Sequence, residues 1–158
     1  MKKIIVLFLL LSAAANAQKE MPNVTLKSES NKSYNVKNDF SQKDKLYVFA
    51  FWATWCVPCI NELDAINKQY AQWSKELNME LVAISVDDAR TQKRIKGLLA
   101  KKNWPYTVLL DENSDLKKAL KIANVPYTIV VKNKKVVYIH DGYTEGGEKE
   151  LYAKLKKL

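Results

Sequence analysis

The sequence predicts a single α/β domain in which helices flank a mixed central sheet. The run 46–52 is continuously apolar and rich in strand-forming residues, and 81–86 is apolar except for Ser85; both have the composition of strands buried on both faces. Helical periodicity follows each run, as in strand–helix–strand crossovers that build a parallel sheet. Two further apolar runs, 127–131 and 136–140, are separated only by the polar segment 132–135 and predict an antiparallel hairpin. Parallel crossovers followed by a hairpin require a mixed sheet.

The expected helices follow from apolar spacing and capping residues. Apolar residues at steps of three and four predict one amphipathic helix over residues 58–77. Asp87 and Asp88 can cap a second, lysine-rich helix that runs to about residue 101. The remaining elements, in chain order, are a strand at 106–110, a turn and cap at 111–114, a short helix at 115–122 and a last helix at about 148–158.

Length and composition fit one domain of ordinary size. The chain has 158 residues, 47% of them apolar and 27% charged, with no internal repeat, low-complexity tract or flexible linker. The polar segment 22–44 contains two short alternating stretches, 24–26 and 34–36, and therefore predicts a small hairpin beside the main sheet. With two cysteines and one histidine, the chain is short of ligands for multi-cysteine or multi-histidine metal sites.

Residues 1–17 have the organisation of a cleaved export signal. A basic start precedes the unbroken apolar run 4–11, and the small residues Ala15 and Ala17 fit a signal peptidase site. The apolar run is shorter than the roughly 20 residues that span a bilayer, which argues against the alternative of an uncleaved membrane anchor. We therefore predict a mature domain, 18–158, in the periplasm or another extracytoplasmic compartment, with no stable membrane span after cleavage.

The mature chain is basic, but its charge lacks the pattern of a nucleic-acid site. Without Lys2 and Lys3 the formal net charge falls from +9 to +7, and this excess is spread as lysine along the whole chain. Arginine, which phosphate and base recognition usually concentrates, occurs only as Arg90 and Arg94. We interpret the charge as a solvated basic surface, with weak steering of acidic partners as an alternative, and expect no nucleic-acid partner.

Both cysteines lie where the first long strand leads into the first long helix, in the segment Phe51-Trp52-Ala53-Thr54-Trp55-Cys56-Val57-Pro58-Cys59. Two cysteines separated by two residues can close a small disulfide ring. The N-terminus of a helix stabilises the thiolate of the first cysteine through its dipole and its unpaired N–H groups. Pro58 fits the first helical turn, where a missing N–H removes no hydrogen bond. Cys56 is therefore a candidate nucleophile near neutral pH.

Other uses of a cysteine pair fit the surrounding residues poorly. A c-type haem attachment site has His directly after the second cysteine, where this chain has Ile60. A structural zinc site needs four ligands, of which only His140 could join the pair without carboxylates, and an iron–sulfur cluster needs more thiolates. A purely structural disulfide is the remaining alternative, although closing so short a loop removes little chain entropy. We assign His140 to a strand end or hairpin at the surface, and Trp52 and Trp104 to packing.

The segment from Phe51 to Cys59, with Pro126 ahead of the C-terminal hairpin and helix, resembles the thioredoxin superfamily. The export signal, the N-terminal segment and the helix between about residues 88 and 101 make the chain similar to the extracytoplasmic TlpA/ResA-like branch. The resemblance covers nearly the whole mature chain. It implies a thioredoxin-like fold with an N-terminal hairpin and an inserted helix, and it implies thiol–disulfide oxidoreductase activity.

The resemblance also implies a role for each residue of the site. Cys56 would be the more exposed, attacking thiolate, and Cys59 the buried thiol that resolves the mixed disulfide. Trp55 would shield the sulfur of Cys56. Pro126 would follow a cis peptide bond and face the cysteine pair, so that the backbone of Val125 can pair with an extended substrate. The alternative for Pro126 is an ordinary trans proline that ends a helix.

One position departs from the pattern of cytoplasmic thioredoxins, which carry a buried aspartate six residues before the first cysteine, where this chain has Ala50. We expect Glu62 to serve Cys59 in proton transfer, because on a helical wheel it falls at the edge of the apolar face, near Ile66 and Trp73. Burial there would raise its pKa towards the range of a general base. ResA-like proteins resemble this chain in carrying a glutamate at the matching position. A solvated Glu62, favoured by the helix dipole, is the alternative.

The resulting hypothesis is an exported thiol–disulfide oxidoreductase that reduces protein disulfides through Cys56 and Cys59, without a cofactor or a metal. We expect protein disulfide or dithiol substrates, a membrane or periplasmic electron donor, and a monomer. One alternative is a non-catalytic module of the same fold that binds unfolded or cysteine-containing chains. Another is a peroxide-reducing enzyme, for which the position of Thr54 relative to Cys56 does not match the usual threonine further upstream.

Overall fold

The computed structural model describes residues 19–158, and the predicted signal peptide lies outside the described residues. The strands are β1 (Thr25–Ser28), β2 (Ser33–Asn35), β3 (Leu46–Trp52), β4 (Met79–Ser85), β5 (Thr107–Leu110), β6 (Tyr127–Lys132) and β7 (Lys135–Asp141). The helices are α1 (Val57–Asn67), α2 (Tyr70–Glu76), α3 (Lys93–Lys102), α4 (Asp115–Leu120) and α5 (Gly147–Leu155). In this part of the chain, no helix has the length and apolar character needed to cross a membrane.

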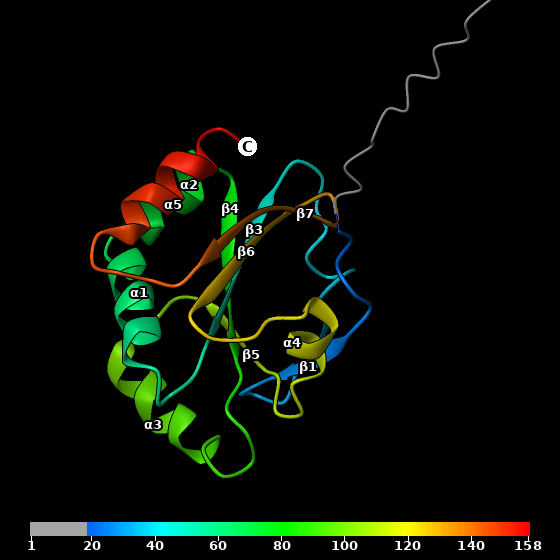
Figure 1. Ribbon diagram of the computed structural model, residues 1–158, viewed down its shortest axis with the longest axis vertical. Helices are drawn as coiled ribbons and strands as arrows, with labels where there is room; N and C mark the ends of the chain where they lie inside the picture. Colours follow the sequence, from blue (N-terminus) through cyan, green and yellow to red (C-terminus); the bar gives the residue numbers. More distant parts are fainter. Residues whose placement is uncertain (1–18) are drawn as a thin grey trace, which may run out of the picture.

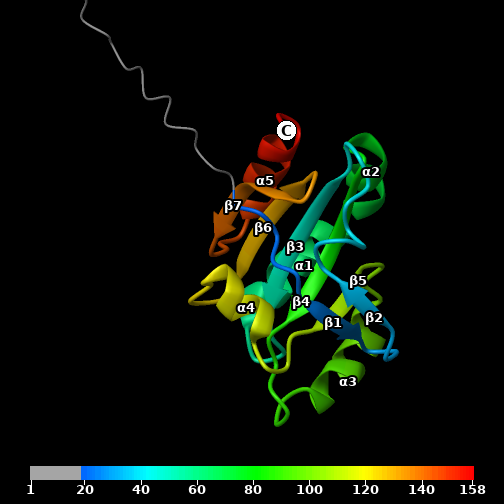
Figure 2. The same ribbon diagram turned by 90° about the vertical axis from the view of Figure 1, so that its right-hand side faces the viewer.

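The strands form one seven-stranded mixed sheet in the order β2-β1-β5-β4-β3-β6-β7. The central strands β3, β4 and β5 are parallel, whereas β6 and β1 join them in antiparallel orientation. The two predicted hairpins, β1/β2 and β6/β7, are present and lie at opposite edges of the sheet (Figure 2). The prediction of an α/β fold with a mixed central sheet, an N-terminal hairpin and an inserted helix is therefore confirmed.

Helices cover both faces of this sheet, with α1, α2, α3 and α5 on one face and α4 on the other (Figure 1). Every residue of β3 is consequently buried. Its side chains alternate between the faces: Ala50 and Trp52 pack beneath α1, while Phe49 and Phe51 belong to the core on the α4 side. Trp52 meets Trp104 edge to face at 5.2 Å between ring centroids, which confirms that both tryptophans serve packing.

The single helix predicted over residues 58–77 is in fact two helices, α1 and α2, separated by a turn at Lys68 and Gln69. The apolar spacing continues through this turn, so the periodic pattern could not reveal it. The turn redirects the chain so that α2 lies against β4. There the Tyr70 hydroxyl accepts a hydrogen bond from the N–H of Leu81 at 3.3 Å.

Of the two predicted helix caps, the one before α3 is wrong and the one before α4 is confirmed. Helix α3 begins at Lys93, later than the paired aspartates predict. Asp88 instead caps a turn in front of the helix by accepting hydrogen bonds from the N–H groups of Arg90 and Thr91. Asp87 does not cap the helix, because its carboxylate accepts hydrogen bonds from Thr54 and Ser85 instead. The prediction for residues 111–114 is confirmed, since Asp111 accepts hydrogen bonds from the first-turn N–H groups of α4.

Candidate active site

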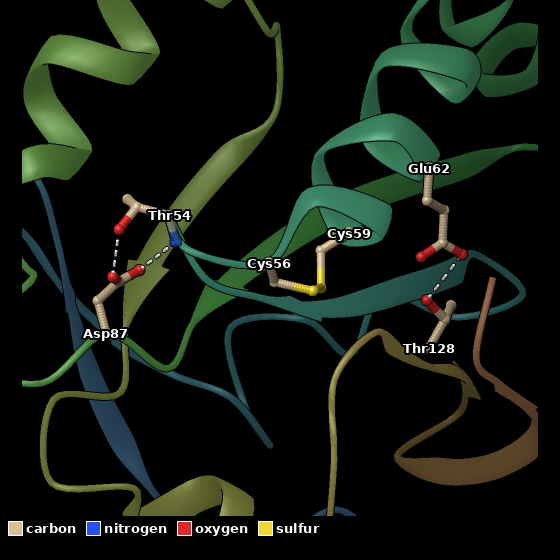
Figure 3. Close-up of a disulfide and its surroundings, with 6 residues drawn as sticks. All are labelled: Thr54, Cys56, Cys59, Glu62, Asp87 and Thr128. Carbon is tan, nitrogen blue, oxygen red and sulfur yellow. Dashed lines mark hydrogen bonds between the residues drawn. A yellow bond between two sulfur atoms is a disulfide. The ribbon is translucent and has the colours of Figure 1, made fainter.

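Cys56 and Cys59 form a disulfide at the start of α1 (Figure 3). After β3 ends at Trp52, a turn closed by a hydrogen bond from the N–H of Cys56 to the carbonyl oxygen of Ala53 (3.0 Å) leads into the helix. Cys56 is the N-cap residue, with extended backbone angles (φ −97°, ψ 91°). The Cα atoms of the two cysteines are 5.3 Å apart. The pair therefore lies at the junction of strand and helix, where the sequence predicts it.

The start of α1 favours a negative charge on the sulfur of Cys56. The helix has no side-chain cap and no acidic residue in its first turn, and Pro58 stands in that turn. Unpaired N–H groups and the positive end of the helix dipole therefore remain available to a thiolate. Even in the disulfide, Cys56 is more exposed than Cys59, at 5% against 1% of their surfaces. This agrees with the order of reactivity that the resemblance implies.

Exposed apolar side chains stand on both sides of Cys56. Trp55 is 57% exposed and Val57 is 65% exposed, and among residues 19–158 the other large exposed hydrophobics are Ile139 and Leu158. Two of these four residues are thus the immediate chain neighbours of Cys56. Neighbouring exposed apolar side chains of this kind are typical of interaction sites.

The segment before β6 reaches the same end of the sheet. Tyr127 pairs with Phe51 in antiparallel register, which places Pro126 level with Trp52, the last residue of β3, where the loop to Cys56 begins. The Val125–Pro126 peptide bond is cis, which is the geometry implied by the resemblance and not that of an ordinary trans proline.

Glu62 follows Cys59 by three residues and points from α1 towards the sheet (Figure 3). Its side chain is 2% exposed, and its carboxylate accepts a hydrogen bond from the Thr128 hydroxyl at 3.4 Å. Burial raises the pKa of Glu62 to about 7; the bond from Thr128 opposes this shift and the charge of Glu148 adds to it. The predicted burial and raised pKa are confirmed, and the solvated alternative is wrong.

The strand register shows how Glu62 comes close to the position of the missing aspartate. Ala50 pairs with Thr128 of β6 on one side and with Ala83 of β4 on the other. Directly paired residues of neighbouring strands project from the same face of a sheet. The hydrogen-bond partner of Glu62 is therefore the immediate neighbour of Ala50. The carboxyl group is supplied by the helix, but it reaches the same region of the sheet.

Asp87, expected from the sequence to cap a helix, is instead 1% exposed and lies beside the loop that carries Cys56. Its carboxylate accepts hydrogen bonds from the N–H of Thr54 (2.8 Å), from the Thr54 hydroxyl (2.5 Å) and from the Ser85 hydroxyl (2.8 Å). It thereby ties the end of β4 to the loop before Cys56. The Thr54 hydroxyl points towards Asp87 and away from the disulfide (Figure 3), in line with the mismatch noted for a peroxide-reducing site.

His140 lies near the end of β7, as predicted, but it is half-buried rather than at the surface. It pairs with Thr128 across β6 and β7, so its side chain shares a face of the sheet with the partner of Glu62. Its Nε2 atom is 3.7 Å from the position that a Cβ atom would occupy at Gly147, the first residue of α5. The imidazole therefore belongs to the surroundings of Glu62.

Fold and cysteine pair together define a thioredoxin-like protein with a redox-active disulfide site. The chain belongs to the AhpC/TSA family, whose model matches residues 17–139. The thiol–disulfide oxidoreductase ResA of Bacillus thuringiensis subsp. konkukian is 28% identical over 141 residues, which cover 89% of this chain and 77% of the relative. By this distant homology and its redox cysteine pair, the protein is a thiol–disulfide oxidoreductase.

Solved structures share the whole architecture. A thioredoxin-like protein from Porphyromonas gingivalis is 40% identical and superposes with a TM-score of 0.75, covering 87% of this chain and 90% of that protein. A DsbE-type protein from Chlorobium tepidum superposes with a TM-score of 0.71 at 21% identity, over 87% of this chain and 96% of its own. At that identity the second likeness concerns the fold alone.

Proposed function

We propose that the protein is an exported reductase of protein disulfides. In the dithiol form, the Cys56 thiolate attacks a substrate disulfide, the substrate S–S bond breaks, and a mixed disulfide forms as the first substrate thiolate leaves and takes up a proton. Cys59 then gives its proton to Glu62 and attacks the sulfur of Cys56. The Cys56–Cys59 disulfide forms, the second substrate sulfur leaves as a thiolate that takes up a proton from solvent, and Glu62 returns its proton to solvent. Two electrons pass from the dithiol to the substrate.

The observation that carries this proposal is the position of the disulfide at the uncapped start of α1, with the more exposed sulfur between two exposed apolar side chains. A structural cross-link over so short a loop stabilises a fold little. A cysteine at an uncapped helix N-terminus, by contrast, has the environment of a reactive thiolate. The buried Glu62 adds a proton acceptor on the side of the resolving cysteine.

For substrate binding we infer a role of Trp55, Val125 and Pro126. The register of β6 with β3 carries Val125 and Pro126 to the end of the sheet from which the loop to Cys56 departs. An extended substrate segment lying beside Val125 would pair with its backbone as an added strand. Trp55, being exposed, would contact the substrate and shield the sulfur of Cys56.

Reduction as the direction, and export as the location, are further parts of the proposal. The resemblance to the TlpA/ResA-like branch favours reduction, and the organisation of residues 1–17 supports export, with residues 18–158 as the mature domain. Outside the cytosol the disulfide is cut off from the cytosolic thiol pool. A membrane or periplasmic dithiol protein must therefore return two electrons and two protons to Cys56 and Cys59 after each cycle.

Reduction of insulin by the mature domain, with dithiothreitol as the electron source, tests the activity. Wild type should accelerate the reaction, and Cys56→Ser should abolish the acceleration. A Cys56→Ser protein that reduces insulin as fast as wild type would sink the proposal. Full function in a variant with both cysteines changed to alanine would support the binding-module alternative. Equilibration with glutathione measures the potential, and a strongly oxidising value would contradict reduction.

Partners are identified by trapping. Cys59→Ala cannot resolve the mixed disulfide, so substrates should stay linked to Cys56 in the exporting cell and be identifiable by mass spectrometry. The matched control, with both Cys56 and Cys59 changed to alanine, should trap none. N-terminal sequencing of the exported protein should begin at Gln18, and an intact start would contradict cleavage after Ala17.

A further inference from the structure

A second buried carboxyl group, Glu148, accompanies Glu62. It lies in the first turn of α5, which packs beside α1 (Figure 1), and its side chain is 8% exposed. The Tyr143 hydroxyl donates a hydrogen bond to the Glu148 carboxylate at 2.9 Å. None of the ion pairs found among residues 19–158 involves Glu62 or Glu148. Two carboxyl groups without a cation thus share the space between α1, α5 and the sheet.

Glu148, unlike Glu62, also borders solvent. A pocket of about 480 Å³ lies between α1 and the start of α5, and Glu62 is not part of its wall. The titratable and polar residues that line it are Asn61, Asp64, Lys68, Tyr143, Glu145 and Glu148. Glu148 is the buried carboxyl group in this wall, so it borders the pocket directly, whereas Glu62 lies in the interior.

We propose that Glu148, held in place by Tyr143, is a positioning residue that acts through Glu62: its negative charge keeps Glu62 ready to hold the proton taken from Cys59. This inference rests on the proposed role of Glu62 as proton acceptor and extends it. Two neighbouring carboxyl groups in a poorly solvated site do not ionise together easily, because like charges repel. The group with the better donors and the better access to water keeps the charge, and the other keeps the proton.

The surroundings of the two groups favour this division. The Glu148 carboxylate accepts the hydrogen bond from the Tyr143 hydroxyl and lines an open pocket, whereas among residues 19–158 the carboxylate of Glu62 accepts one side-chain hydrogen bond, the longer one from Thr128. Glu148 is close enough to raise the pKa of Glu62, in addition to the larger effect of burial. The pKa of Tyr143 is raised to about 12, first by burial, then by its bond to Glu148, and also by the charge of Glu62.

Other titratable groups lie around Glu62 and Glu148, but none of them supplies the charge that Glu148 places near Glu62. Cys59 precedes Glu62 on α1, and His140 lies on the same face of the sheet as Thr128, beside the start of α5. In the pocket wall, Asp64 is bound by Lys102 and by the indole N–H of Trp104. The two remaining charged groups of the wall, Lys68 and Glu145, are both exposed, so solvent screens their charges.

The pH dependence of mixed-disulfide resolution tests the inference. The reduced mature protein is mixed with excess 5,5′-dithiobis(2-nitrobenzoate) in a stopped-flow instrument, between about pH 5 and 9. The first release of thionitrobenzoate reports attack by Cys56, and the second reports resolution by Cys59. In wild type the second rate should rise as Glu62 loses its proton. Glu148→Gln should move the midpoint of this rise to lower pH by about half a pH unit or more, because a repelling charge is gone.

Two further variants make the result specific. Tyr143→Phe removes the donor that stabilises the Glu148 charge, so it should move the midpoint in the same direction by a smaller amount. If Glu148→Gln fails to fold, the midpoint of Tyr143→Phe tests the inference in its place. Glu150→Gln removes a charge from an exposed position of the same helix and should leave the midpoint in place. A folded Glu148→Gln protein with the wild-type midpoint would overturn the inference.

A variant that combines Glu62→Gln with Glu148→Gln distinguishes the inference about Glu148 from the proposed role of Glu62 as proton acceptor. Glu62→Gln should abolish the rise of the second rate, and adding Glu148→Gln should then change nothing further. If Glu62→Gln keeps the rise, Glu62 is not the proton acceptor, and the inference about Glu148 falls with it. The reductase proposal would survive that outcome as long as exchange still depends on Cys56.

Discussion

Asp87 accepts hydrogen bonds from both the backbone N–H and the hydroxyl group of Thr54, two residues before Cys56 (Figure 3). A third bond, from the Ser85 hydroxyl, fixes the carboxylate at the end of β4. The N–H of Val86 donates to the carbonyl oxygen of Trp52 at 2.8 Å and closes the same junction. The loop that presents Cys56 to a substrate is therefore anchored on the neighbouring parallel strand.

Asp87→Asn should destabilise the protein and slow attack by Cys56. The amide replaces one acceptor oxygen with a donor, which then faces the donors of Thr54 or Ser85 in a buried site. We expect a loss of about 2–4 kcal/mol in the free energy of unfolding, measured with urea, and a slower first release of thionitrobenzoate. Thr54→Val, which loses one bond, should cost about 1 kcal/mol, whereas Thr54→Ser should keep both properties near wild type. Wild-type stability of Asp87→Asn would contradict this account of the loop.

The parts of the fold that the sequence predicts are those set by local patterns. The unbroken apolar run 46–52 predicts a central strand, because helices on both faces leave no polar side for it to show. The late start of α3 and the turn at Lys68 and Gln69 could not be predicted. Asp88 has the composition of a helix cap but caps a turn, and the turn between α1 and α2 leaves the apolar period intact.

At the site, too, local patterns predict some features and not others. Cys56, Cys59 and Glu62 lie close together along the start of one helix, so the helical wheel and the resemblance to ResA-like proteins predict a role for Glu62 beside the cysteines. The partners of Glu62 come from elsewhere in the chain. Thr128 meets Glu62 because β6 pairs with β3 in one particular register, and Glu148 meets it because α5 packs against α1. Register and helix packing are long-range properties that no local pattern contains.

The cap of α4 offers a prediction about stability without a role in the chemistry. Asp111 is 1% exposed and accepts hydrogen bonds from the N–H groups of Leu116 (3.1 Å) and Lys117 (2.8 Å). Asp111→Ala should lower the free energy of unfolding by about 1–2 kcal/mol, since two first-turn N–H groups lose their partner. Insulin reduction should keep its wild-type rate at a temperature where the variant is folded. Glu112→Ala, at the exposed neighbouring position, should change the stability by less than about 0.5 kcal/mol.

Trp55 should matter for protein substrates and not for small disulfides. Its ring is exposed beside Cys56, so it can add contact area only for a substrate that extends past the sulfur. Trp55→Ser should raise the KM for insulin several-fold and leave the rate with 5,5′-dithiobis(2-nitrobenzoate) within about twofold of wild type. Ile139→Ser removes a comparably exposed apolar side chain from β7 and serves as the control. An equal loss with both substrates would show that Trp55 acts on the cysteine itself.

Glu62 should make the stability of the protein depend on pH. Its pKa is about 7 in the folded protein against 4.5 in the unfolded chain, so between these values the folded state holds a proton that the unfolded state has released. The stability that Glu62 contributes is therefore complete below about pH 4.5 and is lost as the pH rises through about 7. Relative to Glu62→Gln, wild type should lose on the order of 3 kcal/mol across this window, as measured by urea unfolding at several pH values. Glu150→Gln, which changes an exposed carboxylate, should follow the wild-type curve. Parallel curves for wild type and Glu62→Gln would mean that the carboxyl group titrates alike in both states, and that its burial does not prepare it to accept a proton from Cys59.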